Sequence, residues 1–245
     1  MTSLVLACGL VVLTYGANWI FNHTEIGLAA RDIPGLYVVA FYLGVGVLAP
    51  ALLLRRMLNE TASNQSLGVG FSMRELLWTG SSLGFGAALA YFPLSGHFAE
   101  IGATAKAARL FAGLLVASTA EVLVFVGVLF NAIELSLAKL GGPIPLIAAL
   151  TVSSLAFGFF HLTYPEPWNS VATCLMLTGV WAGVSLVFLL SRSLLAAIVF
   201  NNVMALIGFM QRDLVLPIGA LIGLVAFVAG LGTVAVIVRR SDADV

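Results

Sequence analysis

Two ionisable side chains lie within apolar segments of this sequence and could together perform acid–base chemistry. Glu121 is in the middle of the run from Leu110 to Phe130, and among the eleven acidic residues it alone falls deep in such a run. His161 ends a second apolar run that begins at Pro143. A charged side chain at the centre of a bilayer costs at least about 2.5–3.5 kcal/mol, so a carboxylate there needs a partner or a function. We therefore expect Glu121 and His161 to form an acid–base pair on neighbouring membrane helices.

Asn201 is a third polar residue that could reach the same level of the membrane. Each helical residue adds about 1.5 Å, which places Glu121 roughly 18 Å from one face of the bilayer and Asn201 roughly 12 Å from the opposite face. The two depths sum to about 30 Å, the thickness of the hydrocarbon core, so Glu121 and Asn201 should share a level. By the same count His161 lies roughly 27 Å from the Asn201 face, nearer to the Glu121 face than a shared site requires.

Each of these residues also has a structural interpretation. A buried glutamic acid can be a protonated hydrogen-bond donor that ties helices together, and intramembrane asparagine commonly does the same. A histidine at the end of a helix can be an interfacial anchor. His23 and His97 lie in connecting segments, where we read them as solvated loop residues. One glutamate and one histidine give too few ligands for a closed metal site, and we predict neither a metal nor a cofactor.

The composition requires membrane-spanning helices to position these residues. The chain is 61% hydrophobic and 9% charged, whereas a soluble domain has about 25% charged residues. We predict an all-α fold, a polytopic transmembrane helical bundle in a single integral membrane domain over 1–245, with 110–210 as candidate catalytic core helices. A span needs about 20 mostly apolar residues. Eight segments qualify: 3–21, 35–54, 76–94, 110–138, 144–163, 170–190, 193–211 and 215–238.

Loop charges indicate the orientation of this bundle. With eight spans, seven of the eleven Lys and Arg residues fall on one side and four on the other, which favours cytoplasmic termini. The short connection Leu140-Gly-Gly-Pro143 makes the spans before and after it antiparallel neighbours. The compact loops suggest a multi-pass protein of a prokaryotic inner (cell) membrane. The net charge is zero and no basic patch is present, so we expect membrane lipid, and no nucleic acid, among the partners.

Two local patterns surround the ionisable residues. The segment from Glu121 fits the pattern E-E-x-x-x-R, continued by G-x-L-F, with Val122 in place of the second Glu and Val126 in place of the Arg. The pattern F-x-x-x-H is present in full at Phe157 and His161, after a Ser-Leu-Ala lead. An F-x-x-x-H by itself carries little weight in a chain with 16 phenylalanines.

A third pattern follows in the expected order. The lead Ser193–Ile198 precedes a degenerate H-x-x-x-N, in which Asn201 takes the His position and Ala205 the Asn position. Together these motifs, and the loop Leu67–Trp78, resemble those of the CAAX-protease and bacteriocin-processing (CPBP) family of intramembrane glutamic proteases. The resemblance covers roughly residues 65–210.

The resemblance implies a mechanism and a kind of substrate. Glu121 would activate a water molecule for attack on a scissile carbonyl, His161 would assist, and Asn201 would donate its amide N–H to the oxyanion. The substrate would be a membrane-associated peptide or protein, cut within a peptide or at a C-terminal tail. The departures at Val122 and Val126 leave a catalytically inactive relative, acting as a membrane binding or immunity-type protein, as an alternative. A small transporter or an unrelated helical bundle, with Glu121 as a proton-relay group, is a third.

Overall fold

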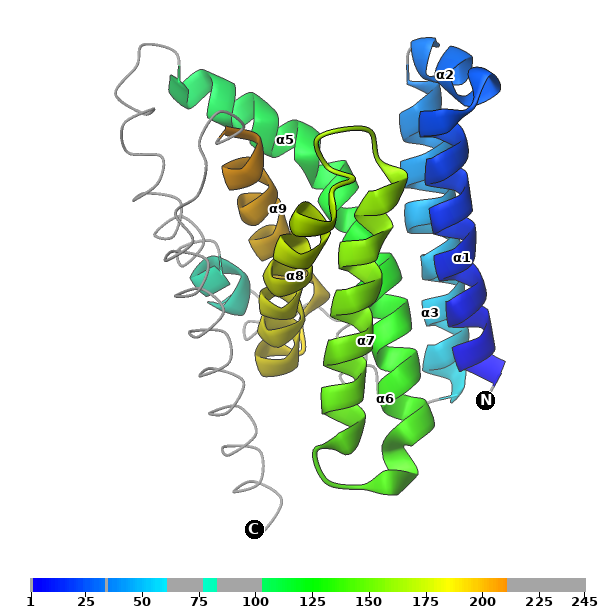
Figure 1. Ribbon diagram of the computed structural model, residues 1–245. Helices are drawn as coiled ribbons and strands as arrows, with labels where there is room; N and C mark the ends of the chain where they lie inside the picture. Colours follow the sequence, from blue (N-terminus) through cyan, green and yellow to red (C-terminus); the bar gives the residue numbers. More distant parts are fainter. Residues whose placement is uncertain (1, 34, 61–76, 83–102, 211–245) are drawn as a thin grey trace.

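The computed structural model describes residues 2–33, 35–60, 77–82 and 103–210, and within these ranges all regular structure is helical. The predicted all-α bundle is thereby confirmed (Figure 1). In lipid a helix is favoured because it satisfies its own backbone hydrogen bonds. Five described helices are long and apolar enough to cross a membrane: Ser3–His23, Val38–Leu58, Phe111–Leu140, Ile144–Thr163 and Val171–Ser191.

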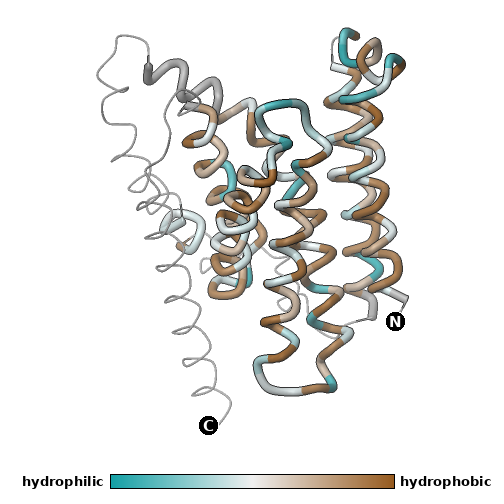
Figure 2. The backbone as a smooth tube through the Cα atoms, in the orientation of Figure 1, coloured by the Kyte–Doolittle hydropathy of each residue, from teal (hydrophilic) through white to brown (hydrophobic). Residues whose placement is uncertain are grey.

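These five helices correspond to five of the eight predicted spans. The predicted span 193–211 is a helix of 17 residues, shorter than the roughly 20 that a full crossing needs. The predicted span 215–238 and most of 76–94 lie outside the described residues. Apolar residues predominate along α1, α7 and α8, whereas hydrophilic residues gather in α2 and in the connection between α7 and α8 (Figure 2).

The helices follow one another along the chain in four groups. The first group is α1 (Thr2–His23) and α2 (Glu25–Asp32). The second is the π-helix η1 (Val38–Leu48), which continues into α3 (Ala49–Glu60). The third is α5 (Ala103–Val122), the π-helix η3 (Leu123–Phe130), α6 (Asn131–Leu137) and the 3₁₀ turn η4 (Ala138–Leu140). The fourth is α7 (Ile144–Phe160) with the 3₁₀ turn η5 (His161–Thr163), then α8 (Val171–Ser191) and α9 (Leu194–Met210).

Local sequence explains where several helices begin and end. The hydroxyl of Ser170 accepts a hydrogen bond of 3.1 Å from the backbone N–H of Thr173 and so caps α8. Arg192 ends α8 in the left-handed conformation, with φ of 50°. Gly141 and Gly142 also have positive φ, and they turn the chain from α6 back into α7. These two helices pack against each other as an antiparallel pair, which confirms the predicted neighbours (Figure 1).

Close helix contacts depend on small residues. A Cβ atom built at Gly46 of η1 would overlap the Cβ of Ala120 in α5, and one at Gly158 of α7 would lie 2.5 Å from the carbonyl oxygen of Cys174 in α8. Small residues let transmembrane helices approach closely. The contact at Gly46 matters for the site, because Ala120 directly precedes Glu121.

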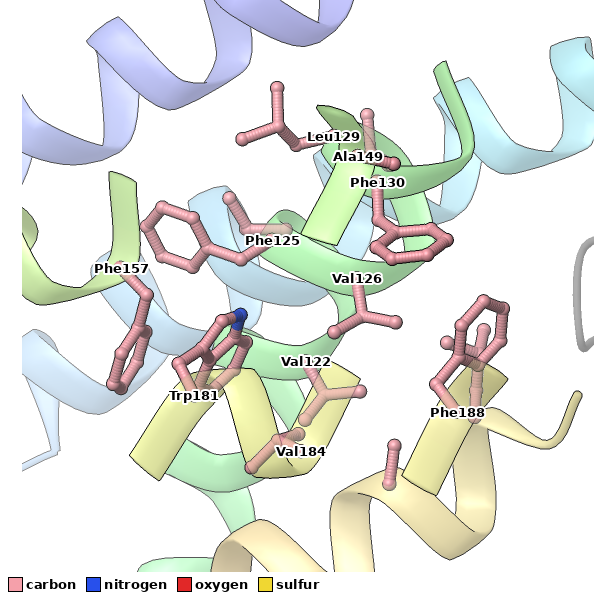
Figure 3. Close-up of a cluster of buried hydrophobic side chains, with 14 of the residues drawn as sticks. Val122, Phe125, Val126, Leu129, Phe130, Ala149, Phe157, Trp181, Val184 and Phe188 are labelled. Atoms are coloured by element: carbon pink, nitrogen blue, oxygen red, sulfur yellow. The ribbon is translucent and has the colours of Figure 1, made fainter. Parts of the chain in front are cut away.

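The core lies between η3, α7 and α8. Trp181 of α8 stacks on Phe157 of α7 with ring centroids 3.7 Å apart, and Phe125 of η3 meets both rings edge-on (Figure 3). The indole N–H of Trp181 donates to the hydroxyl of Ser153 at 3.2 Å, and that hydroxyl donates to the carbonyl of Phe125 at 2.7 Å. These interactions fix α7 relative to η3. Because α7 leads directly to His161, and η3 directly follows the end of α5 that carries Glu121, they also fix the relative positions of these two residues.

Candidate active site

Glu121 and Asn201 meet between α5 and α9. The side-chain amide of Asn201 donates a hydrogen bond of 3.0 Å to Oε2 of Glu121. Asn201 is buried, with 3% of its surface exposed, whereas Glu121 is half-buried. The expected common depth of these two residues is thus confirmed. The amide that the sequence assigned to an oxyanion contacts the carboxylate instead.

Asn202 holds α9 in the register that makes this contact possible. Its amide donates to the carbonyl of Phe111 at 2.8 Å, and its carbonyl oxygen accepts from the hydroxyl of Ser118 at 3.1 Å. Its side chain is fully buried against α5. The role of Asn202 was not predicted from the sequence, although two consecutive asparagines in an apolar helix were a visible signal.

His161 is fixed by the same spacing that defines F-x-x-x-H. Its Nδ1 lies 3.0 Å from the carbonyl oxygen of Phe157, one helical turn earlier, and the two rings pack edge-on at 4.7 Å. A carbonyl oxygen only accepts hydrogen bonds, so Nδ1 carries the proton and donates it. In the neutral ring Nε2 is then the basic nitrogen, and in the described part of the chain no hydrogen bond occupies it.

A small cavity adjoins Glu121. Its volume is about 10 Å³, which is close to what one water molecule needs. A peptide does not fit in this space. The cavity is lined by Thr14, Phe41, Tyr42, Gly46, Ala120, Glu121, Val124, Phe125, Phe160 and Tyr164.

His161 lies next to this cavity without lining it. Its ring stacks on Tyr164 at 5.1 Å and meets Phe160 edge-on at 5.7 Å, and both of these residues line the cavity with Glu121. Among the described residues no hydrogen bond joins His161 to Glu121 or to Asn201. The structure therefore brings Glu121 and Asn201 into direct contact and relates His161 to them through two aromatic side chains.

Three tyrosines form a polar group beside the carboxylate. The Tyr42 hydroxyl interacts with those of Tyr37 and Tyr164, and the Tyr37 hydroxyl donates to Oδ1 of Asn18 at 2.8 Å. Burial in the bundle raises the pKa of Tyr164, which follows the last residue of its span, well above the ordinary value of a phenol. These three tyrosines were not predicted from the sequence. One signal was available, because Tyr164 follows the F-x-x-x-H motif by three positions.

Helix α1 braces the turn that carries His161 and Tyr164. The amide of Asn18, which is fully buried, donates to the hydroxyl of Thr163 at 2.7 Å, and Nε2 of His23 lies 3.2 Å from the Thr163 carbonyl oxygen. The interpretation of His23 as a solvated loop residue is therefore wrong in part. Its side chain is exposed, but it is the last residue of α1 and makes a contact across the bundle. His97 lies outside the described residues.

The two positions that depart from the first motif lie in the core. Val122 and Val126 are both fully buried and face Trp181 and Val184 (Figure 3). Apolar side chains can replace a buried ion pair without loss of stability, so these departures are compatible with a stable bundle. Within the described part of the chain, no group of three or more His, Cys, Asp or Glu side chains is arranged to hold a metal ion.

Comparison with known proteins agrees with this architecture. Residues 103–240, more than half of the 245, match the family described as "Type II CAAX prenyl endopeptidase Rce1-like". The chain therefore belongs to this family of CAAX-type intramembrane proteases, as the motif resemblance indicated. Its environment is lipid, and a peptide or protein is its kind of substrate. No curated protein and no solved structure matches the chain. The cell-membrane location, the prokaryotic origin and the cytoplasmic termini stay predictions.

Proposed function

We propose that this protein is an intramembrane glutamic endopeptidase in which Glu121 activates water. The family supports a CAAX-type intramembrane protease as the kind of function. One observation carries the assignment of the base: Glu121 lines a cavity with room for about one water molecule. A second supports it, because the amide of Asn201 holds Oε2 of the carboxylate in place at 3.0 Å.

The proposed reaction begins with proton transfer from water to the Glu121 carboxylate. As the proton leaves, the water oxygen bonds to the scissile carbonyl carbon, and the carbonyl electron pair moves onto its oxygen. When the tetrahedral intermediate collapses, the carbonyl forms again, the C–N bond breaks, and the leaving nitrogen takes the proton that Glu121 received from water. His161 assists through Nε2, which is the basic nitrogen because Nδ1 donates to the carbonyl of Phe157.

The proposed substrate is a membrane-associated peptide or C-terminal tail. A space of about 10 Å³ holds water but no peptide, so the substrate must part the helices that line the cavity. Helices η1 and α5 form one wall, where Gly46 lies against Ala120. A substrate tethered in the bilayer would reach this wall from the lipid.

Cleavage by the full chain in liposomes tests the proposal. The substrate is a lipid-anchored peptide with a farnesylated cysteine near its C-terminus, followed by mass spectrometry of the released tail. We expect wild-type protein to cut it, and Glu121→Gln and His161→Ala to abolish cutting. Glu25→Gln, at an exposed position of α2, is the matched control and should retain full activity. Undiminished cleavage by both site variants would refute the mechanism.

A catalytically inactive relative is the second candidate function. It is favoured by one observation, namely that Val122 and Val126 are core residues and place no charge beside Glu121. This reading predicts that the wild-type chain captures a membrane partner without cutting it. It also predicts that Glu121→Gln leaves both capture and the cellular phenotype unchanged, an outcome that the protease proposal excludes.

A further inference from the structure

The oxyanion of the proposed reaction needs hydrogen-bond donors that Asn201 does not supply in this geometry. The amide of Asn201 donates to Glu121, and Asn201 does not line the cavity. Donors must therefore come from other residues around that space. Three described lining residues carry a side-chain O–H group: Thr14, Tyr42 and Tyr164.

The Thr14 hydroxyl already donates a hydrogen bond within its own helix. The acceptor is the carbonyl oxygen of Leu10, at 2.8 Å within α1. Among the described lining residues, Tyr42 and Tyr164 therefore remain as side-chain donors. We propose that these two tyrosines are catalytic residues that stabilise the oxyanion, an inference that rests on the proposed endopeptidase function.

Both rings are held in place before substrate arrives. Tyr164 stacks on His161 at 5.1 Å and packs edge-on against Phe160 at 5.3 Å. Tyr42 packs edge-on against Tyr37 at 5.2 Å and against Phe41 at 5.1 Å. Donors that are fixed before the reaction stabilise a developing charge without a cost of reorganisation at that moment.

The hydroxyl protons can be counted. Tyr37 donates its proton to Asn18, so it is not shared with the cavity. Tyr42 and Tyr164 interact through their hydroxyls. Because Tyr37 gives its own proton to Asn18, its contact with Tyr42 uses the Tyr42 proton, and the contact between Tyr42 and Tyr164 uses the Tyr164 proton. Both protons can turn to the oxyanion, because a charged oxygen is a stronger acceptor than a neutral phenol. Burial raises the pKa of Tyr164, which keeps this hydroxyl a donor that does not release its proton.

Phenylalanine substitutions test the assignment, since they remove each hydroxyl and keep each ring, including the Tyr164 ring that stacks on His161. We expect Tyr42→Phe or Tyr164→Phe to lower kcat, by up to about 10²–10³-fold for a full donor, while KM stays within about twofold. The double variant should lose more than either single variant. Tyr15→Phe is the matched control, because its hydroxyl donates to the carbonyl of Ala156 outside the cavity, and it should retain wild-type kcat.

The assay uses the same liposomes and lipid-anchored peptide, with thermal melting of each variant measured in parallel. If wild-type protein cuts the peptide and Glu121→Gln does not, the endopeptidase function stands. Wild-type kcat in the double tyrosine variant would then overturn the tyrosine assignment alone. A rise in KM at constant kcat would overturn it too, because the hydroxyls would then only bind substrate. If wild-type protein cuts nothing, the proposed function fails and the tyrosine assignment with it.

Discussion

The Asn201 amide donates a hydrogen bond of 3.0 Å to the Glu121 carboxylate across 80 residues of sequence. It is the direct polar contact between two of the three residues that the sequence singled out. Asn201 takes the motif position of a histidine, which can also donate to a carboxylate.

Substitutions at Asn201 should separate its support of Glu121 from its packing. Asn201→Ala removes the donor, and we expect it to lower cleavage activity and to destabilise the bundle by about 1–3 kcal/mol. Asn201→His restores a ring donor and should retain more activity than the alanine variant. Initial rates in liposomes and thermal unfolding in detergent check both. Higher activity in Asn201→Ala than in Asn201→His would contradict this role.

Charges at the two core positions of the first motif should be tolerated only as a pair. Val122→Glu alone places an unpaired carboxylate in a fully buried position, which we expect to cost about 3–5 kcal/mol. Val122→Glu with Val126→Arg should recover part of that loss. Thermal melting of both variants and of wild-type protein provides the comparison. A single variant as stable as wild-type protein would show that this region is more open than the structure indicates.

The contact between α7 and α8 should be sensitive to one methyl group. In Gly158→Ala the new Cβ would meet the Thr178 hydroxyl and lie 2.5 Å from the Cys174 carbonyl oxygen. Because backbone must move, we expect a loss of about 1–3 kcal/mol in the free energy of unfolding. Gly113→Ala is the control, since nothing lies within 4 Å of that position, and it should be neutral or stabilising. Equal melting temperatures for both variants would refute the expected clash.

The entry into α9 should depend on an ion pair. Arg192 donates to both carboxylate oxygens of Glu134, at 2.7 and 2.5 Å, with both side chains partly exposed. Arg192→Lys removes the bidentate geometry, and we expect it to lower the free energy of unfolding by about 1 kcal/mol. Thermal unfolding at low and high salt measures this effect. A variant whose stability and salt dependence equal those of wild-type protein would show that the pair contributes nothing.

Counting residues along each helix correctly predicted that Glu121 and Asn201 lie at the same depth. The rise of a helix fixes depth, so it placed Glu121 and Asn201 at one level. It says nothing about lateral position, and for that reason it gave no account of the aromatic residues between His161 and Glu121. The same limit explains why Tyr42 was missed, since its proximity to Glu121 depends on how η1 packs against α5. The spacing of the F-x-x-x-H motif was more informative for His161, because its contact with Phe157 lies within one helical turn.

Helix α1 contacts the turn after α7 through Asn18 and Thr163, and η1 lines the cavity beside Glu121. Both contacts matter for any shortened form of the protein. The stretch that carries the family likeness begins at residue 103, yet Tyr42, Gly46 and Thr14 precede it and close the cavity. We expect a truncated chain that keeps only that stretch to lack one wall of the cavity beside Glu121. The first fifty residues therefore contribute to the proposed site, and we expect that swapping them between relatives would alter cleavage as well as membrane anchoring.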